Sequence, residues 1–139
     1  KHIQWAVLAV VIIALAVYYL NYEQSKSAGA TPGNERIYHM VTGEFKAVAE
    51  NGKEVEVYRW DPGTIYVKKG EQVQLNISGV NGDSHPFVIE GLDIRGEVKK
   101  GKETIVRFTA EEEGIYRIIC YNHHDLQNGG PMVGYIIVD

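Results

Sequence analysis

The sequence predicts an all-β domain, a β-sandwich or small Greek-key barrel, behind one N-terminal transmembrane helix. Short runs of alternating apolar and polar residues recur at steady spacing with turn-forming residues between them, which is typical of half-buried strands. Beyond the N-terminal segment, no stretch keeps helical apolar spacing for a full helix. A long, nearly unbroken apolar run occurs at the start of the chain.

That first segment has the length and composition of a membrane anchor. Ile3 to Tyr22 counts 20 positions, interrupted only by Gln4 and Asn21. About 20 helical residues cross a hydrocarbon core of about 30 Å. Aromatic residues of the kind found at membrane interfaces flank the run: Trp5, Tyr18, Tyr19 and Tyr22. We therefore predict an anchor over residues 1–22, with Lys1 on the inner side and the rest of the chain outside the cytoplasm.

A cleavable signal peptide is the alternative for this segment. Its apolar core is usually shorter, about 7–15 residues, and small residues follow at the cleavage site. Ser27 to Ala30 are small enough to keep that alternative open. Residues 23–36 are polar and rich in small residues, Gly and Pro, so we predict a linker there and a folded domain over 37–139.

Seven runs in residues 37–139 are predicted to be strands. Asn51-Gly52 precedes the first of them and is a hairpin turn signal. The runs are Glu54–Tyr58, Thr64–Val67, Gln72–Ile77, Phe87–Ile89, Thr104–Phe108, Gly114–Cys120 and Val133–Val138. About seven short strands in roughly a hundred residues indicate a sandwich or a small barrel.

Composition excludes several classes of function. The 139 residues carry 14 Lys and Arg against 18 Asp and Glu, for a net charge of −4, and no basic stripe is present. We therefore expect no nucleic-acid partner. The single cysteine excludes an intramolecular disulfide framework, a tetrathiolate zinc site and a cysteine-ligated iron–sulfur cluster.

Five residues that favour soft metals gather in two places along the chain. One place is His85, and the other extends from Cys120 past His123 and His124 to Met132. Taken singly, each has an ordinary role as a core thiol, a solvated imidazole, a packing thioether or a turn residue. Taken together, thiolate, imidazole and thioether are the ligands that select copper. These residues therefore predict a copper site at one end of the sandwich.

At these residues the chain resembles the cupredoxin fold, and most closely the copper domain of subunit II of heme-copper oxidases, especially the B-type enzymes with a single-helix subunit II. The matching segments are His85–Ile94, Gly114–Cys120 and Met132–Val138, with Gly70, Thr104 and Phe108 also in similar places. The likeness spans residues 53–139. It implies a cupredoxin-like Greek-key sandwich behind a membrane anchor.

The ligand motif departs from that family. Its dinuclear CuA centre uses two cysteines, then a histidine and a methionine. Here Cys120 matches the first cysteine, His124 stands at the second and Asn128 at the later histidine, while Met132 is displaced by one residue. Because two bridging thiolates are needed, the chain cannot form an ordinary CuA centre.

A mononuclear site with one copper ion per chain is expected instead. His85, Cys120, His124 and Met132 would supply the two-His, one-Cys, axial-Met set of electron-transfer copper. The loop is also similar to that of nitrosocyanin, a red copper protein, and that resemblance implies His123 as the ligand. Spacing does not decide between His123 and His124, and Asp125 is a further oxygen-ligand candidate.

The resemblance implies an electron-transfer role rather than catalysis by this chain alone. We expect a subunit II-like component of a heme-copper oxygen or nitric oxide reductase. It would lie on the outer face of a prokaryotic cytoplasmic membrane, between a soluble cytochrome c or cupredoxin donor and a heme-containing catalytic subunit. The alternatives are a metal-free structural subunit of a quinol-fed reductase and a stand-alone red or blue copper carrier. Nitrite reduction is a weaker alternative, because no additional acid–base set is evident.

Overall fold

The computed structural model describes residues 13–19 and 35–139. Residues 13–19 are helical. The predicted anchor, 1–22, otherwise lies outside the described residues, as does the predicted linker up to residue 34. Within the described part of the chain, no helix combines the length and apolar character needed to cross a membrane. We describe the domain that begins at Glu35, inside the predicted linker, by itself.

Residues 35–139 form nine strands in two sheets, so the predicted all-β sandwich is confirmed. The first sheet has the order β2-β1-β4-β7 and the second the order β3-β9-β8-β5-β6. The strands of the first sheet are β1 (Glu35–Val48), β2 (Glu54–Asp61), β4 (Gln72–Gly79) and β7 (Glu103–Thr109). Those of the second are β3 (Thr64–Val67), β5 (Ser84–Ile89), β6 (Ile94–Lys99), β8 (Gly114–Cys120) and β9 (Val133–Val138). One 3-10 turn, η1 (Leu126–Asn128), lies between β8 and β9.

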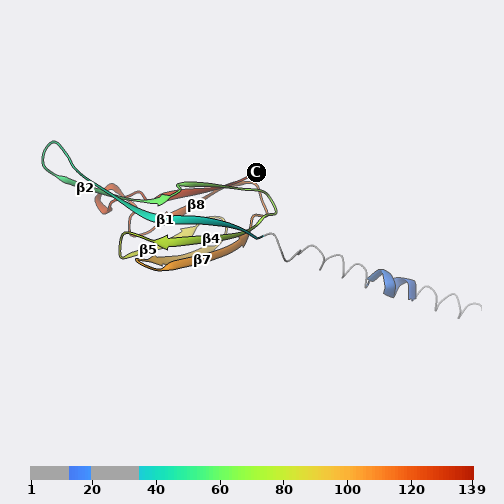
Figure 1. Cartoon of the computed structure of the whole chain (residues 1–139). Helices are drawn as coiled ribbons and strands as arrows, with labels where there is room; N and C mark the ends of the chain where they lie inside the picture. Colours follow the sequence, from blue (N-terminus) through green and yellow to red (C-terminus); the bar gives the residue numbers. More distant parts are fainter. Residues whose placement is uncertain (1–12, 20–34) are drawn as a thin grey trace, which may run out of the picture. The chain divides into compact units, whose positions relative to one another are not determined.

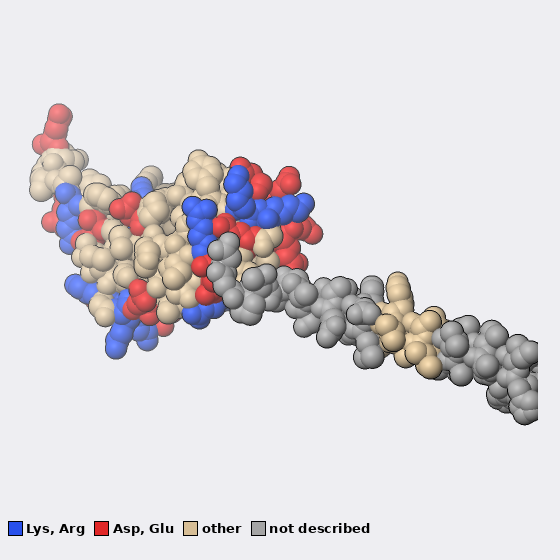
Figure 2. All heavy atoms as spheres, turned by 45° about the vertical axis from the view of Figure 1, so that its right-hand side comes forward, with Lys and Arg blue, Asp and Glu red and all other residues tan. Residues whose placement is uncertain are grey.

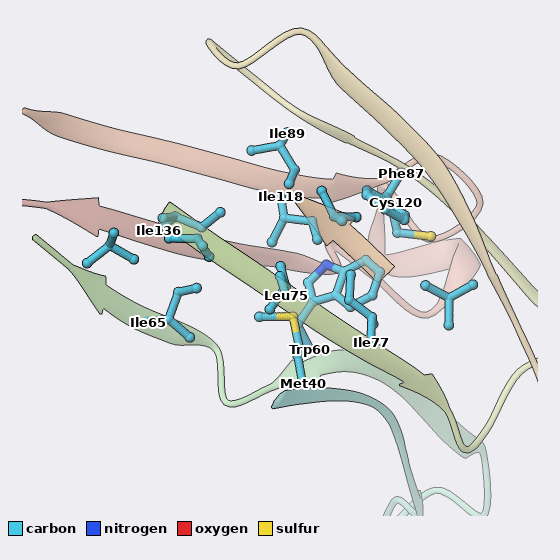
Figure 3. Close-up of a cluster of buried hydrophobic side chains, with 14 of the residues drawn as sticks. Met40, Trp60, Ile65, Leu75, Ile77, Phe87, Ile89, Ile118, Cys120 and Ile136 are labelled. Carbon is cyan, nitrogen blue, oxygen red and sulfur yellow. The ribbon is translucent and has the colours of Figure 1, made fainter. Parts of the chain in front are cut away.

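The two sheets enclose a core of alternating apolar side chains. Figure 3 shows its centre, where Trp60 lies beside Leu75 and Met40, and where Cys120 lies beside Phe87 at one edge of the cluster. The rings of Trp60 and Phe87 meet edge to face, with centroids 5.9 Å apart. Cys120 is therefore part of the buried apolar core, and its side chain is not exposed at the surface.

Strand β1 was not predicted, because its alternation carries few core residues. Only Met40 and Thr42 are buried along the whole strand, and the residues after Thr42 pair with β2 without a core beneath them. In Figure 1 this hairpin extends past the rest of the two sheets, and the C-terminus lies at the opposite end of the domain. We call residues 43–59 of this hairpin the arm.

Strand β6 was also missed, since charged residues hide its buried face. Ile94, Gly96 and Val98 alternate with Arg95, Glu97 and Lys99. The middle inward position is glycine because Phe87 lies across it: a Cβ there would come within 2.6 Å of the Phe87 ring.

Charged side chains of both signs cover the outside of this domain. On the face shown in Figure 2, basic and acidic residues are interspersed, without one large area of a single sign among the described residues. Exposed ion pairs such as Arg117–Glu90 at 2.6 Å and Lys68–Asp139 at 3.2 Å are part of this mixture. Such pairs contribute little to stability, about 0–1 kcal/mol each. The fold is therefore stabilised mainly by its buried core.

Candidate metal centre

His85 and Cys120 meet because their strands run antiparallel. His85 lies near the start of β5 and Cys120 is the last residue of β8, and Phe87 pairs with Cys120 in the register of the two strands. The ends that carry the two side chains are therefore neighbours. Both side chains are completely buried, and the Cys120 sulfur lies 3.8 Å from His85 Nδ1.

The segment after β8 folds back and adds His123 to the pair. Its Nδ1 lies 3.5 Å from the Cys120 sulfur and 3.2 Å from His85 Nδ1. The fold-back is fixed by the main chain, since Met132 N–H donates to the His123 carbonyl at 2.8 Å. Gly130 lies so close that a Cβ would come within 2.1 Å of that carbonyl oxygen. Residue 130 must therefore be glycine for this path.

The three ligand atoms fit a metal ion. They are 3.2 to 3.8 Å apart, so the point equidistant from all three lies about 2 Å from each, within the usual range of metal–nitrogen and metal–sulfur bonds, about 2.0 to 2.3 Å. Two imidazoles and one thiolate in a triangle are the donor set of electron-transfer copper sites. Among the described residues, this His-Cys-His group is the cluster that can hold copper.

The tautomer of His85 is set by a turn that precedes β5. Its Nε2 lies 2.6 Å from the Asn81 carbonyl oxygen, which can only accept, so Nε2 carries the hydrogen. In the neutral ring, Nδ1 then presents its lone pair to Cys120 and His123. Gly82 makes the turn possible: its φ is +79°, and a Cβ there would meet His85 Nε2 at 2.4 Å. The Asn-Gly dipeptide was the available sequence signal for this support.

His124 and Asp125 lie outside the cluster. The His124 side chain is 61% exposed, its Nδ1 lies 2.8 Å from the Tyr121 carbonyl oxygen and its Nε2 lies 3.1 Å from an Asp125 carboxylate oxygen. Asp125 caps the turn η1, where its carboxylate accepts from the Gln127 and Asn128 N–H groups. Both residues thus stabilise the outer part of the loop.

Met132 lies next to the cluster through the main chain. Cys120 N–H donates to the Met132 carbonyl at 3.1 Å, and Met132 N–H donates to the His123 carbonyl. The Met132 side chain is completely buried. The structure therefore joins Cys120, His123 and Met132 in one hydrogen-bonded unit.

Burial controls the protonation of the ligands. It raises the pKa of the Cys120 thiol, while the N–H groups of His123 and Asn122 oppose that shift. Without metal the thiol is therefore protonated at neutral pH, and binding a metal here would release that proton. Burial, followed by the proximity of His85, lowers the pKa of His123, so this imidazole is neutral and able to ligate.

Acidification is expected to destabilise the copper-free protein through His123. Its folded pKa lies below the ordinary value of 6.5, so the unfolded chain takes up a proton more readily as pH falls through 6.5. Stability therefore decreases in that window. Urea unfolding between about pH 7.5 and pH 5 should show a shallower pH dependence for His123→Gln than for the parent chain. Parallel curves for the two would contradict this.

A family model described as a cupredoxin-like domain matches residues 11–133. The chain belongs to the cupredoxin-like family.

Cytochrome c oxidase subunit 2 from Thermus thermophilus is 33% identical to this chain over 81 residues. The matched stretch covers 58% of this chain and 58% of that protein. Subunit 2 from a named strain of the same species is matched at 33% identity over 58% of this chain and 47% of that protein. The resemblance to oxidase subunit II is confirmed, although this cupredoxin-like chain spans only about half the length of these curated relatives.

Solved structures share the fold at low sequence identity. The multicopper oxidase mgLAC has a TM-score of 0.61 and 22% identity, covering 76% of this chain and 39% of that one. A copper-containing nitrite reductase from Thermus scotoductus has a TM-score of 0.58 and 20% identity, covering 76% and 28%. At these identities the likeness establishes the cupredoxin sandwich.

Proposed function

We propose that this cupredoxin-like chain binds one copper ion between His85, Cys120 and His123, and that it passes single electrons as a subunit II-like component of a membrane heme-copper oxygen or nitric oxide reductase. The observation that carries the proposal is the triangle of ligand atoms, 3.2 to 3.8 Å apart, at the ends of β5 and β8. Buried Met132 is the fourth candidate ligand.

His123 is preferred to His124 because of where the loop places them. His123 shares the buried end of the sandwich with Cys120, whereas both ring nitrogens of His124 already have partners at the surface. Since His124 stands at the position of the missing second cysteine, a second metal has no inward ligand there. The proposed site is therefore mononuclear.

The chain's own residues prepare this site before any metal arrives. Copper, when bound, would supply a one-electron change between its two common oxidation states. His85 is already held by Asn81, and Cys120 and Met132 are joined through their main chains. Because His85 and Cys120 are buried and the loop is held by main-chain hydrogen bonds, we expect little rearrangement to accompany the gain or loss of an electron. Cys120 also joins the site covalently to β8.

The similarity to oxidase subunit 2 and the apolar N-terminal run support the proposed location and partners. In this proposal, residues 1–22 anchor the chain, 23–36 form a linker and 37–139 form the domain on the outer face of a prokaryotic cytoplasmic membrane. A soluble cytochrome c or cupredoxin delivers electrons, and a heme-containing membrane subunit accepts them.

A pair of adjacent substitutions tests the copper site. The purified chain, titrated with Cu(II), should bind one copper ion and give the EPR hyperfine pattern of a single nucleus. His123→Ala should lower copper affinity by about a hundredfold or more, since losing a ligand costs more than losing an outer-shell partner. His124→Ala, the matched control, should change affinity little.

Two results would contradict the proposal. A folded chain that takes up no copper would indicate a metal-free structural subunit. Loss of copper in His124→Ala but not in His123→Ala would show that the loop binds metal in another arrangement. The donor can be tested separately, by stopped-flow reduction of the copper-loaded chain with reduced soluble cytochrome c.

A further inference from the structure

Tyr58 lies directly against the ring of His123. The two ring centroids are 4.0 Å apart and the planes are inclined by 31°, a close stacked arrangement. Tyr58 comes from β2 in the first sheet, whereas His123 follows β8 in the second. The contact therefore joins the arm to the segment 121–132 that follows β8.

Tyr58 is itself held in place at three points. Its N–H donates to the Gly129 carbonyl at 2.7 Å, and its hydroxyl donates to the Glu56 carboxylate. Its ring lies close to Gly129, where a Cβ would come within 2.9 Å of the ring and φ is +71°. Backbone, hydroxyl and ring face are all fixed, so the Tyr58 ring is a rigid surface.

The two histidines of the centre differ in how their rings are oriented. Metal-binding histidines usually donate their second N–H to a carboxylate, a carbonyl or water, and this bond fixes the ring. His85 follows that rule through Asn81. For His123, no hydrogen bond from Nε2 to another described residue is found, and because the ring is half-buried this atom is open to water, while Nδ1 faces Cys120 and His85. An exchanging water fixes a ring less firmly than a carbonyl group does, so a further contact is required to hold this ring as firmly as that of His85.

We infer that Tyr58 is that support: a positioning residue whose ring holds the His123 imidazole with Nδ1 directed at Cys120. The inference rests on the proposed copper site and adds to it the residue that orients the ligand. The ring performs this role, so the hydroxyl and its bond to Glu56 are secondary. The ring contact thus gives His123 the orientation that the Asn81 carbonyl gives His85.

Three variants of the full chain test this. Tyr58→Leu removes the ring, Tyr58→Phe keeps the ring and removes the hydroxyl, and Tyr66→Leu is the matched control at an exposed tyrosine on β3. In the copper-free protein, NMR should show the His123 ring protons shifted by the Tyr58 ring current in the parent and in Tyr58→Phe, but not in Tyr58→Leu. After addition of Cu(II), Tyr58→Leu should bind about 10- to 100-fold more weakly. Its EPR spectrum should be altered or heterogeneous, whereas Tyr58→Phe and Tyr66→Leu retain the parent spectrum.

The outcomes separate this inference from the proposed function. If the parent binds copper and Tyr58→Leu keeps the parent His123 shifts, affinity and EPR spectrum, the role of Tyr58 is overturned while the copper site stands. Equal losses in Tyr58→Phe and Tyr58→Leu would also overturn it, because the hydroxyl would then be the essential group. A parent chain that binds no copper but shows the ring-current shift would overturn the proposed function, and with it the role of Tyr58 toward a metal.

Discussion

Replacing Cys120 with serine is expected to abolish tight copper binding and the strong visible absorption of a copper–thiolate site. Cys120 is the only thiol in the chain, and its sulfur is the one soft ligand atom beside the two imidazole nitrogens. A serine hydroxyl is a hard, poorly ionised donor and cannot replace the thiolate. We expect copper affinity to fall by more than the roughly 100-fold that an outer-shell change costs, as measured by competition titration and optical spectroscopy.

Unfolding of the copper-free variant distinguishes a ligand effect from misfolding. The serine hydroxyl would face His85 Nδ1 and His123 Nδ1, which can hydrogen-bond to it, as they approach the sulfur now. The free energy of unfolding should therefore change by only about 1–2 kcal/mol. An unchanged optical spectrum in folded Cys120→Ser would show that copper binds without the thiolate and would refute the assigned site.

Replacing Phe87 with alanine is expected to have the largest effect on stability. Its side chain is 1% exposed, meets Trp60 edge to face and fills the space above Gly96. Deleting such a ring leaves a cavity and costs about 3–5 kcal/mol. Because a domain of this size is stable by about 5–15 kcal/mol, urea unfolding should shift strongly to lower concentration.

Phe45 provides the matched control for this change. It lies on the arm and is 60% exposed, so Phe45→Ala should alter the free energy of unfolding by no more than about 0.5 kcal/mol. A similar loss in both variants would mean that the arm is packed in solution. A small loss of unfolding free energy in Phe87→Ala would mean that the core relaxes to fill the cavity, which would contradict its inferred close packing.

The strands were largely predictable where apolar residues that enter the core alternate along the sequence. The runs Thr64–Val67, Gly114–Cys120 and Val133–Val138 were predicted with the bounds that the structure shows. Strand β1 was not, since half of its length pairs with β2 outside the core. Strand pairing there depends on main-chain hydrogen bonds and hairpin geometry, which leave little alternation in the sequence.

The sequence indicated the candidate residues of the site but not how they are arranged. Chemistry and order along the chain indicated His85 and Cys120, and the structure places them together. Spacing left His123 and His124 equivalent, because the fold-back depends on Met132 N–H and Gly130 from the far end of the loop. Tyr58 had no signal at all, since its contact with His123 joins a strand of the first sheet to a loop residue 65 positions away.

The hydrogen bond from Cys120 to the Met132 carbonyl makes the loop between β8 and β9 a separable unit. It closes residues 121–131 into a segment whose two ends are fixed by the sandwich. Side-chain changes at exposed positions of that segment leave the main-chain pairing of β8 with β9 intact. A loop graft that keeps Gly130 and the two ends is therefore a route to a different number or kind of metal ions in the same domain. The exposed His124 is a position that such a graft can exchange, whereas Gly130 has to be kept.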